Sequence, residues 1–184
     1  MEVELTMRKK LYATVYDFAS ILMTAIITVA FLFAFFMKIS TVNGNSMNNT
    51  LYNGDRLIIT ARDKSVDYGD IVIISQPNAY NEVLIKRVIA TGGQTIDIDI
   101  MKNTVTVDGK VLSEPYIKER NRVLGDAFDY PITVPEGYVF VMGDNRNDSG
   151  DSRYAAVGLI DERYIVGEAV YRIGDSSWLN TVNS

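Results

Sequence analysis

The chain has 184 residues, which suits one compact domain with a short membrane segment, so no second large domain is needed to explain its length. It contains no cysteine and no histidine, which excludes disulfides, a thiolate nucleophile and an imidazole base; acid–base chemistry near neutral pH must then use Lys, Asp, Glu or Tyr. Its 18 Lys and Arg residues against 23 Asp and Glu residues give a net charge of −5, so we expect no nucleic acid partner.

The first predicted element is a membrane-spanning helix over residues 18–37. This segment carries no charge and is bounded by Asp17 and Lys38. About 20 apolar residues are enough to cross the hydrocarbon core as a helix. A buried helix of a soluble protein would have a polar face, and a cleavable signal peptide would have a shorter apolar region that ends at small residues. We therefore expect an uncleaved transmembrane anchor.

The charges around the apolar segment predict its orientation. Basic residues occupy positions 8–10, whereas Lys38 is a single charge on the other side. Because positively charged flanks stay in the cytoplasm, residues 1–17 are predicted to be a cytoplasmic tail and residues 38–184 an extracytoplasmic domain. The prediction is a single-pass protein of the cell membrane, in contact with the lipid bilayer.

Beyond the anchor, short β-branched runs alternate with Gly-Asp or Asn-Gly turn signals, a pattern typical of antiparallel β proteins. Asp108-Gly109 predicts a two-residue hairpin, because a type I′ turn requires positive φ at both positions. We therefore expect a mainly β domain. The predicted strands are 56–60, 70–75, 83–90, 95–100, 105–107, 138–142 and 164–173.

Three segments contain side chains suited to chemistry: residues 43–51, 84–90 and 143–153. Taken alone, the first is explained as a surface loop, the second as a strand with one charged pair, and the third as a solvated polar turn. The third segment also lacks the acidic twelfth residue of a calcium-binding loop. We expect no metal and no cofactor.

The second segment has a physical peculiarity. In a strand, Lys86 shares a face with Leu84, Val88 and Ala90, while Arg87 points to the opposite face, so one of the two cations must lie among apolar neighbours. If it is Lys86, desolvation lowers its pKa from about 10.4, as a lysine base requires; arginine stays protonated. The alternative is a lysine that extends past the sheet edge into water.

The order of these motifs resembles a known family. Ser46-Met47, then Lys86-Arg87 in an apolar strand, then the run from Gly143 to Arg153 resembles the bacterial type I signal peptidases, the leader peptidases of serine peptidase family S26. The resemblance extends over nearly the whole chain and includes residues 54–58, 69–72 and 165–169. The short stretch between the second and third motifs resembles the compact enzymes of Gram-positive bacteria.

The resemblance implies a signal-peptidase-like antiparallel β-sheet catalytic domain that acts as a serine endopeptidase. Ser46 is then the nucleophile and Lys86 the general base of a Ser/Lys dyad. The implied substrates are secretory preproteins, whose signal peptides are removed after small residues at positions −1 and −3. The Ser46 N–H is the implied donor to the oxyanion.

The resemblance also implies supporting residues. Ser149 matches a hydroxyl that orients the lysine, Asp151 and Arg153 match a supporting ion pair, and Asp144 is implied to be structural. One departure is Asn49, which stands where the family usually has proline and loosens the turn after the nucleophile.

Gly44 is a second departure, since some relatives carry a hydroxyl at this position that helps to bind the oxyanion; here backbone N–H groups would have to suffice. Two other functions stay open. One is a signal-peptidase-like protein dedicated to pilus or surface-fibre assembly, acting as a non-proteolytic chaperone. The other is a self-cleaving repressor-type Ser/Lys protease, against which the anchor and the lack of a DNA-binding module argue.

Overall fold

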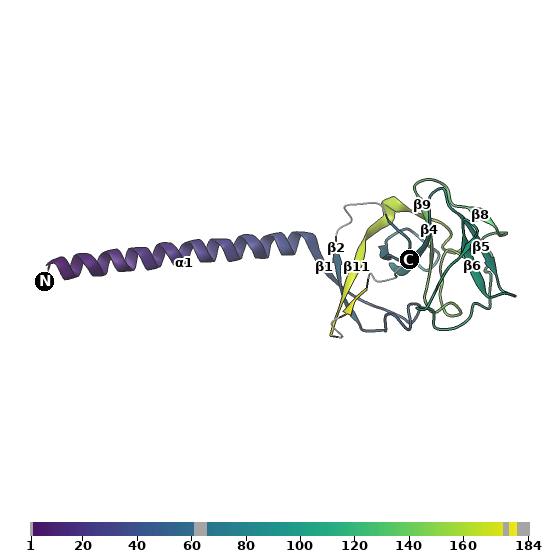
Figure 1. Cartoon of the computed structure of the whole chain (residues 1–184), viewed down its shortest axis with the longest axis horizontal. Coiled ribbons are helices and arrows are strands. Elements are labelled where there is room, and N and C mark those ends of the chain that lie inside the picture. The colour runs from purple at the N-terminus through teal and green to yellow at the C-terminus, as the bar shows by residue number, and fades with distance from the viewer. Residues whose placement is uncertain (1, 61–65, 175–176, 180–184) are drawn as a thin grey trace. The chain divides into compact units, whose positions relative to one another are not determined.

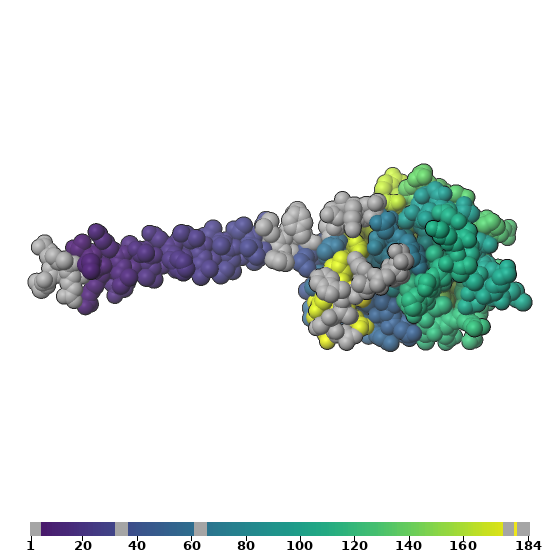
Figure 2. Space-filling view, viewed as in Figure 1, coloured from purple at the N-terminus to yellow at the C-terminus, as the bar shows by residue number. Residues whose placement is uncertain are grey.

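A computed structural model describes residues 2–60, 66–174 and 177–179, and it divides the chain into two compact units, Met1–Lys38 and Ile39–Ser184. The first unit contains helix α1, Glu2–Phe36. Residues 5–31 are exposed along the whole helix, the purple segment of Figure 2. The stretch Leu5–Phe31 is long and apolar enough to cross a membrane.

Helix α1 begins well before the predicted apolar segment. The residues that precede Phe18 include Glu, Leu, Met, Arg, Lys and Ala, which all favour helix and therefore extend it toward the N-terminus. The helix ends at Phe36, and Met37 is the first residue of strand β1. The helix thus joins the β domain without an intervening loop.

The second unit is built on a large antiparallel sheet, whose described strands follow the order β1-β2-β11-β3-β4-β9-β10. Figure 1 labels β1, β2, β11, β4 and β9 of this sheet. Strand β11 lies between β2 and β3, so the last long strand of the chain occupies the middle of the sheet. The short strand β12 also pairs with β11. The strands are β1 Met37–Thr41, β2 Arg56–Thr60, β3 Ile71–Ile74, β4 Leu84–Thr91, β9 Tyr138–Met142, β10 Ile160–Asp161, β11 Ile165–Ile173 and β12 Ser177–Trp178.

A smaller sheet has the described order β7-β6-β5-β8. Asp108 and Gly109 connect β6 to β7 with φ values of 51° and 77°, so the predicted hairpin is confirmed. The predicted mainly antiparallel β fold, with one N-terminal apolar helix, is confirmed as well. The strands of this sheet are β5 Thr95–Asp99, β6 Thr104–Val107, β7 Lys110–Val111 and β8 Ile132–Thr133; a 3₁₀ turn, Glu162–Tyr164, precedes β11.

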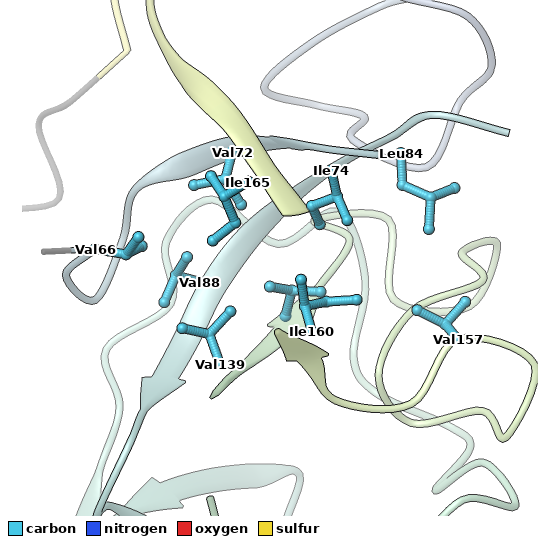
Figure 3. Close-up of a cluster of buried hydrophobic side chains, with 10 residues drawn as sticks. Val66, Val72, Ile74, Leu84, Val88, Val139, Val157, Ile160 and Ile165 are labelled. Carbon is cyan, nitrogen blue, oxygen red and sulfur yellow. The ribbon is translucent and has the colours of Figure 1, made fainter. Parts of the chain in front are cut away.

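Clusters of buried aliphatic side chains hold the large sheet to the loops that pack on it and to the smaller sheet. One cluster, drawn in Figure 3, joins β3, β4, β9, β10 and β11. Another fills the space between the two sheets with residues such as Ile89, Phe140 and Ile98. The members of the first cluster are Val66, Val72, Ile74, Leu84, Val88, Val139, Val141, Val157, Ile160 and Ile165.

Strand β4 departs from the simple alternation expected of it. Its pairing with β9 shifts register between Val88 and Ala90, as a β-bulge does. Ala90 packs with Ile89 in the cluster between the sheets, whereas Val88 belongs to the other cluster. The predicted placement of Ala90 on the face of Lys86 is therefore wrong, because the bulge interrupts the two-residue period.

Candidate active site

Ser46 lies in a turn between β1 and β2 and is half-buried. Gly44 has a φ of 91°, a conformation that favours glycine, and its N–H donates to Asn53 Oδ1 at 2.9 Å. The following side chain, Met47, is buried and anchors the turn to the core. On the other side, Asn145 N–H donates to the Ser46 carbonyl oxygen at 3.0 Å. Ser46 is thus held by contacts before and after it, and from segment 143–153.

Lys86 reaches Ser46 from β4. Its Nζ lies 2.8 Å from Ser46 Oγ and donates to the Ile85 carbonyl oxygen at 3.1 Å. The side chain is only 3% exposed. Burial lowers the pKa of Lys86 to about 8, and the nearby carboxylates of Asp151 and Asp144 oppose that shift. A large fraction of Lys86 is therefore neutral in mildly alkaline solution and can accept the serine proton.

The sequence required one of the two adjacent cations to be buried, and the structure buries both. Arg87 is 2% exposed, and its Nε and one terminal nitrogen donate to the Asp144 carboxylate at 2.9 and 2.7 Å. Its other terminal nitrogen donates to the Gly69 carbonyl oxygen at 2.7 Å. The Thr50 hydroxyl also donates to Asp144. Asp144 therefore joins the nucleophile turn to the strand that carries the lysine.

Asp151 and Arg153 form the ion pair that the resemblance implied. Arg153 donates to both carboxylate oxygens of Asp151 at 2.8 Å, and both side chains are fully buried. Asp151 also accepts the Gly143 N–H at 3.0 Å. Together, these hydrogen bonds hold the backbone of residues 143–153, the segment that contacts the Ser46 carbonyl oxygen through Asn145.

Ser149 lines the same cleft as Ser46 and Lys86. Its Oγ is buried and makes no hydrogen bond with the described residues, so the structure shows no hydrogen bond from Ser149 to the lysine. A Cβ on Gly143 would stand 2.3 Å from Ser149 Oγ and 2.4 Å from the Ser46 carbonyl oxygen. Gly143 thus allows the close approach of this segment to the nucleophile. Asn49, at the family's proline position, is exposed and follows a cis peptide bond.

The reactive pair opens into a cleft of about 650 Å³. Its walls come from residues 40–47, from residues 82–86 with Tyr80, and from residues 148–150. Within the part of the chain that the structure describes, no three carboxylates converge in a way that would hold a metal ion. The chemistry available in the cleft is that of a hydroxyl beside a desolvated amine.

Sequence reasoning missed the role of Arg87, which it treated only as a competitor of Lys86 for burial. A charged residue inside an otherwise apolar strand was the available signal, since such a residue needs a buried partner. It also missed Thr50 and Asn145, whose hydrogen bonds to residues far away in the sequence leave no local pattern. The family described as signal peptidase, peptidase S26, matches residues 15–174.

The chain belongs to the signal peptidase family, peptidase S26. It is therefore a serine peptidase, and the predicted family is confirmed. The signal peptidase I of Bacillus licheniformis is 35% identical over 171 residues, which cover 86% of this chain and 88% of that protein. The signal peptidase I S of Bacillus subtilis (strain 168) is 31% identical over 182 residues, which cover 93% and 94%.

Among solved structures, the crystal structure of a signal peptidase I from Enterococcus faecalis V583 is 30% identical to this signal peptidase family member. It covers 57% of this chain and 97% of its own, with a TM-score of 0.46. Preproteins with signal peptides are the substrates that membership of the family implies.

Proposed function

We propose that this serine peptidase removes signal peptides from exported preproteins with a Ser46–Lys86 dyad, and that α1 anchors it in the membrane where those preproteins emerge. The observation that carries the proposal is the 2.8 Å separation of Lys86 Nζ from Ser46 Oγ, with the lysine buried. Desolvating an amine costs free energy. A non-proteolytic chaperone would have no use for that arrangement, so the dyad favours the peptidase over the chaperone.

In the proposed mechanism, neutral Lys86 takes the proton of the Ser46 hydroxyl as Oγ attacks the scissile carbonyl. The resulting ammonium then protonates the leaving amine, and the neutral amine activates a water that hydrolyses the acyl-enzyme. The Ser46 N–H is our candidate donor to the oxyanion, because none of the described residues accepts a hydrogen bond from it.

The lining of the cleft supports one part of the proposed specificity, namely that the residues at positions −1 and −3 are uncharged. Val42, Leu84 and Ile85 line it close to the nucleophile. Their apolar side chains favour uncharged substrate residues beside the scissile bond, because a charge would be desolvated there without a partner.

Direct cleavage tests the proposal. The full-length protein in detergent is incubated with a preprotein that has Ala at −1 and −3, and the new N-terminus is sequenced. We expect a single cut after position −1, and no cut in a matched preprotein with Phe at −1. A protein that leaves the first preprotein intact, although folded, contradicts the proposed function.

The pH dependence of kcat/KM should report the lysine. Only neutral Lys86 accepts the proton, and its pKa of about 8 in the fold lies below the usual 10.5. Activity should therefore rise about tenfold per pH unit below pH 8 and level off above it. Initial rates from pH 6 to 9.5 at low substrate concentration measure this, with circular dichroism as the control for folding. A flat profile, or a rise that continues without levelling off up to pH 9.5, is the result that excludes a desolvated lysine base.

The orientation of the anchor is tested on intact protoplasts. The basic residues at 8–10 should keep the N-terminus inside, so external protease should digest the domain after Lys38 and spare an epitope tag at the N-terminus. Permeabilised cells, in which both parts become accessible, are the control. Protection of the domain in intact cells means that the orientation is reversed.

A further inference from the structure

Among the described residues, the largest fully buried side chains include three arginines, Arg87, Arg146 and Arg153. Each receives a contact from one irregular segment between β7 and β8, residues 114–121, which we call the strap. The strap contains no regular secondary structure. Its contacts therefore need a reason other than the pairing of strands.

Glu114 is the first contact of the strap. Its carboxylate accepts two hydrogen bonds from Arg146, at 2.5 and 3.1 Å, and the two side chains are 9% and 0% exposed. Arg146 Nε in turn donates to the Gly143 carbonyl oxygen at 3.2 Å. Farther along the strap, Lys118 N–H donates to the Asp144 carbonyl oxygen at 3.0 Å. The strap thus holds the Asp144 carbonyl group directly, through Lys118, and the Gly143 carbonyl group indirectly, through the Glu114–Arg146 pair.

Tyr116 is the second contact. The centroid of its ring lies 4.1 Å from the guanidinium carbon of Arg87, which is a cation–π distance. Arg87 is also the arginine that donates hydrogen bonds to Asp144. Its hydroxyl lies 3.1 Å from the Tyr68 hydroxyl. The Tyr116 side chain is thus held at its ring face by Arg87 and at its hydroxyl by Tyr68. The third contact, Asn121, accepts a hydrogen bond from Arg153 at 2.7 Å.

The segment that the strap holds is also the one that holds the nucleophile. Asn145 N–H donates to the Ser46 carbonyl oxygen, and Gly143 leaves no space for even a Cβ between itself and that oxygen. A shift of about 1 Å in residues 143–145 therefore moves Ser46 relative to Lys86. Misplacement of that size is enough to cost a large factor in rate.

Buried ion pairs contribute little net stability, because the cost of desolvation offsets their attraction; in some proteins they fix one conformation instead. We propose that the strap is a positioning element for the Ser46–Lys86 reaction, with Glu114 and Tyr116 acting through Arg146 and Arg87. The inference rests on the proposed function. It adds residues that touch neither the substrate nor the reacting atoms.

The test uses the full-length protein in detergent and the preprotein assay above. Glu114→Gln keeps the shape of the side chain but removes the charge that binds Arg146. We expect kcat to fall at least tenfold with KM nearly unchanged, and the pH inflection to move upward from about 8, because a loosened segment 143–146 admits water to Lys86. Glu119→Gln is the matched control: Glu119 pairs with the exposed Arg122, which directly follows the strap, and the activity of this variant should stay within twofold of wild type.

A second pair of variants separates positioning from general packing. Tyr116→Leu removes the ring from Arg87 and should reproduce the loss of kcat, whereas Tyr116→Phe keeps the ring and should restore most of the activity. Thermal melts show which variants fold. Unchanged kcat and pH profile in folded Glu114→Gln and Tyr116→Leu overturn the inference, and so does failure of both to fold, which makes the strap a folding element. A wild-type protein that does not cleave the preprotein contradicts the proposed function instead.

Discussion

Replacing Ser46 or Lys86 with alanine should each lower kcat/KM on a preprotein by about 10⁴-fold or more, since removal of either member of a nucleophile–base pair has effects of that size. The two losses should not add in the double variant, because the residues act as one unit across 2.8 Å. Lys86→Arg should be equally inactive, since a guanidinium does not deprotonate in proteins. Product formation followed by gel electrophoresis measures all four.

The control for this prediction is Lys110→Ala, which removes an exposed lysine of β7 and should leave kcat/KM unchanged. Melting temperatures verify that each variant is folded. If a folded Lys86→Ala variant retained turnover within tenfold of wild type, another group would have to be the base.

Replacing Asp144 with alanine should lower the free energy of unfolding by about 3–5 kcal/mol, because it leaves the buried Arg87 without its partner. Both side chains are almost fully buried, so water cannot screen the loss. Urea denaturation of the detergent-solubilised chain, followed by near-ultraviolet circular dichroism, reports the packing of the β domain without the signal of α1.

The matched control is Asp148→Ala, which removes an exposed carboxylate from the same segment and should change the free energy of unfolding by less than about 0.5 kcal/mol. Equal stability of the two variants would mean that the Arg87–Asp144 pair contributes nothing to the fold.

Much of the fold follows from local sequence. The β-branched runs form the long strands because their side chains suit a pleated, half-buried surface, and Asp108-Gly109 turns the chain because it tolerates positive φ. The two-residue strands β8, β10 and β12 were not predicted, since pairs so short carry no periodic signal. The bulge after Val88 was missed for a similar reason: register depends on the partner strand, not on the strand itself.

The active site was predictable in part. Ser46 and Lys86 belong to motifs that resemble a family, and the apolar neighbours of Lys86 gave a physical reason for its lowered pKa. The contact of Glu114 with Arg146 joins residues far apart in the sequence, and each residue alone is an ordinary charged side chain. Only the folded chain shows that a single segment reaches all three buried arginines.

The position of β11 also determines when the site can assemble. Ile165–Ile173 pairs with β2 on one side and β3 on the other, strands that were made about a hundred residues earlier in the sequence. Until this stretch has been made, β2 and β3 each have an unpaired edge, and the sheet whose strands β1 and β2 are joined by the Ser46 turn is incomplete. Contacts of such large sequence separation form late, after the entropy of a long loop has been lost. A nascent or truncated chain that ends before Ile165 contains Ser46 and Lys86 and yet lacks a complete large sheet, so we expect proteolytic competence only after Ile165–Ile173 has been made.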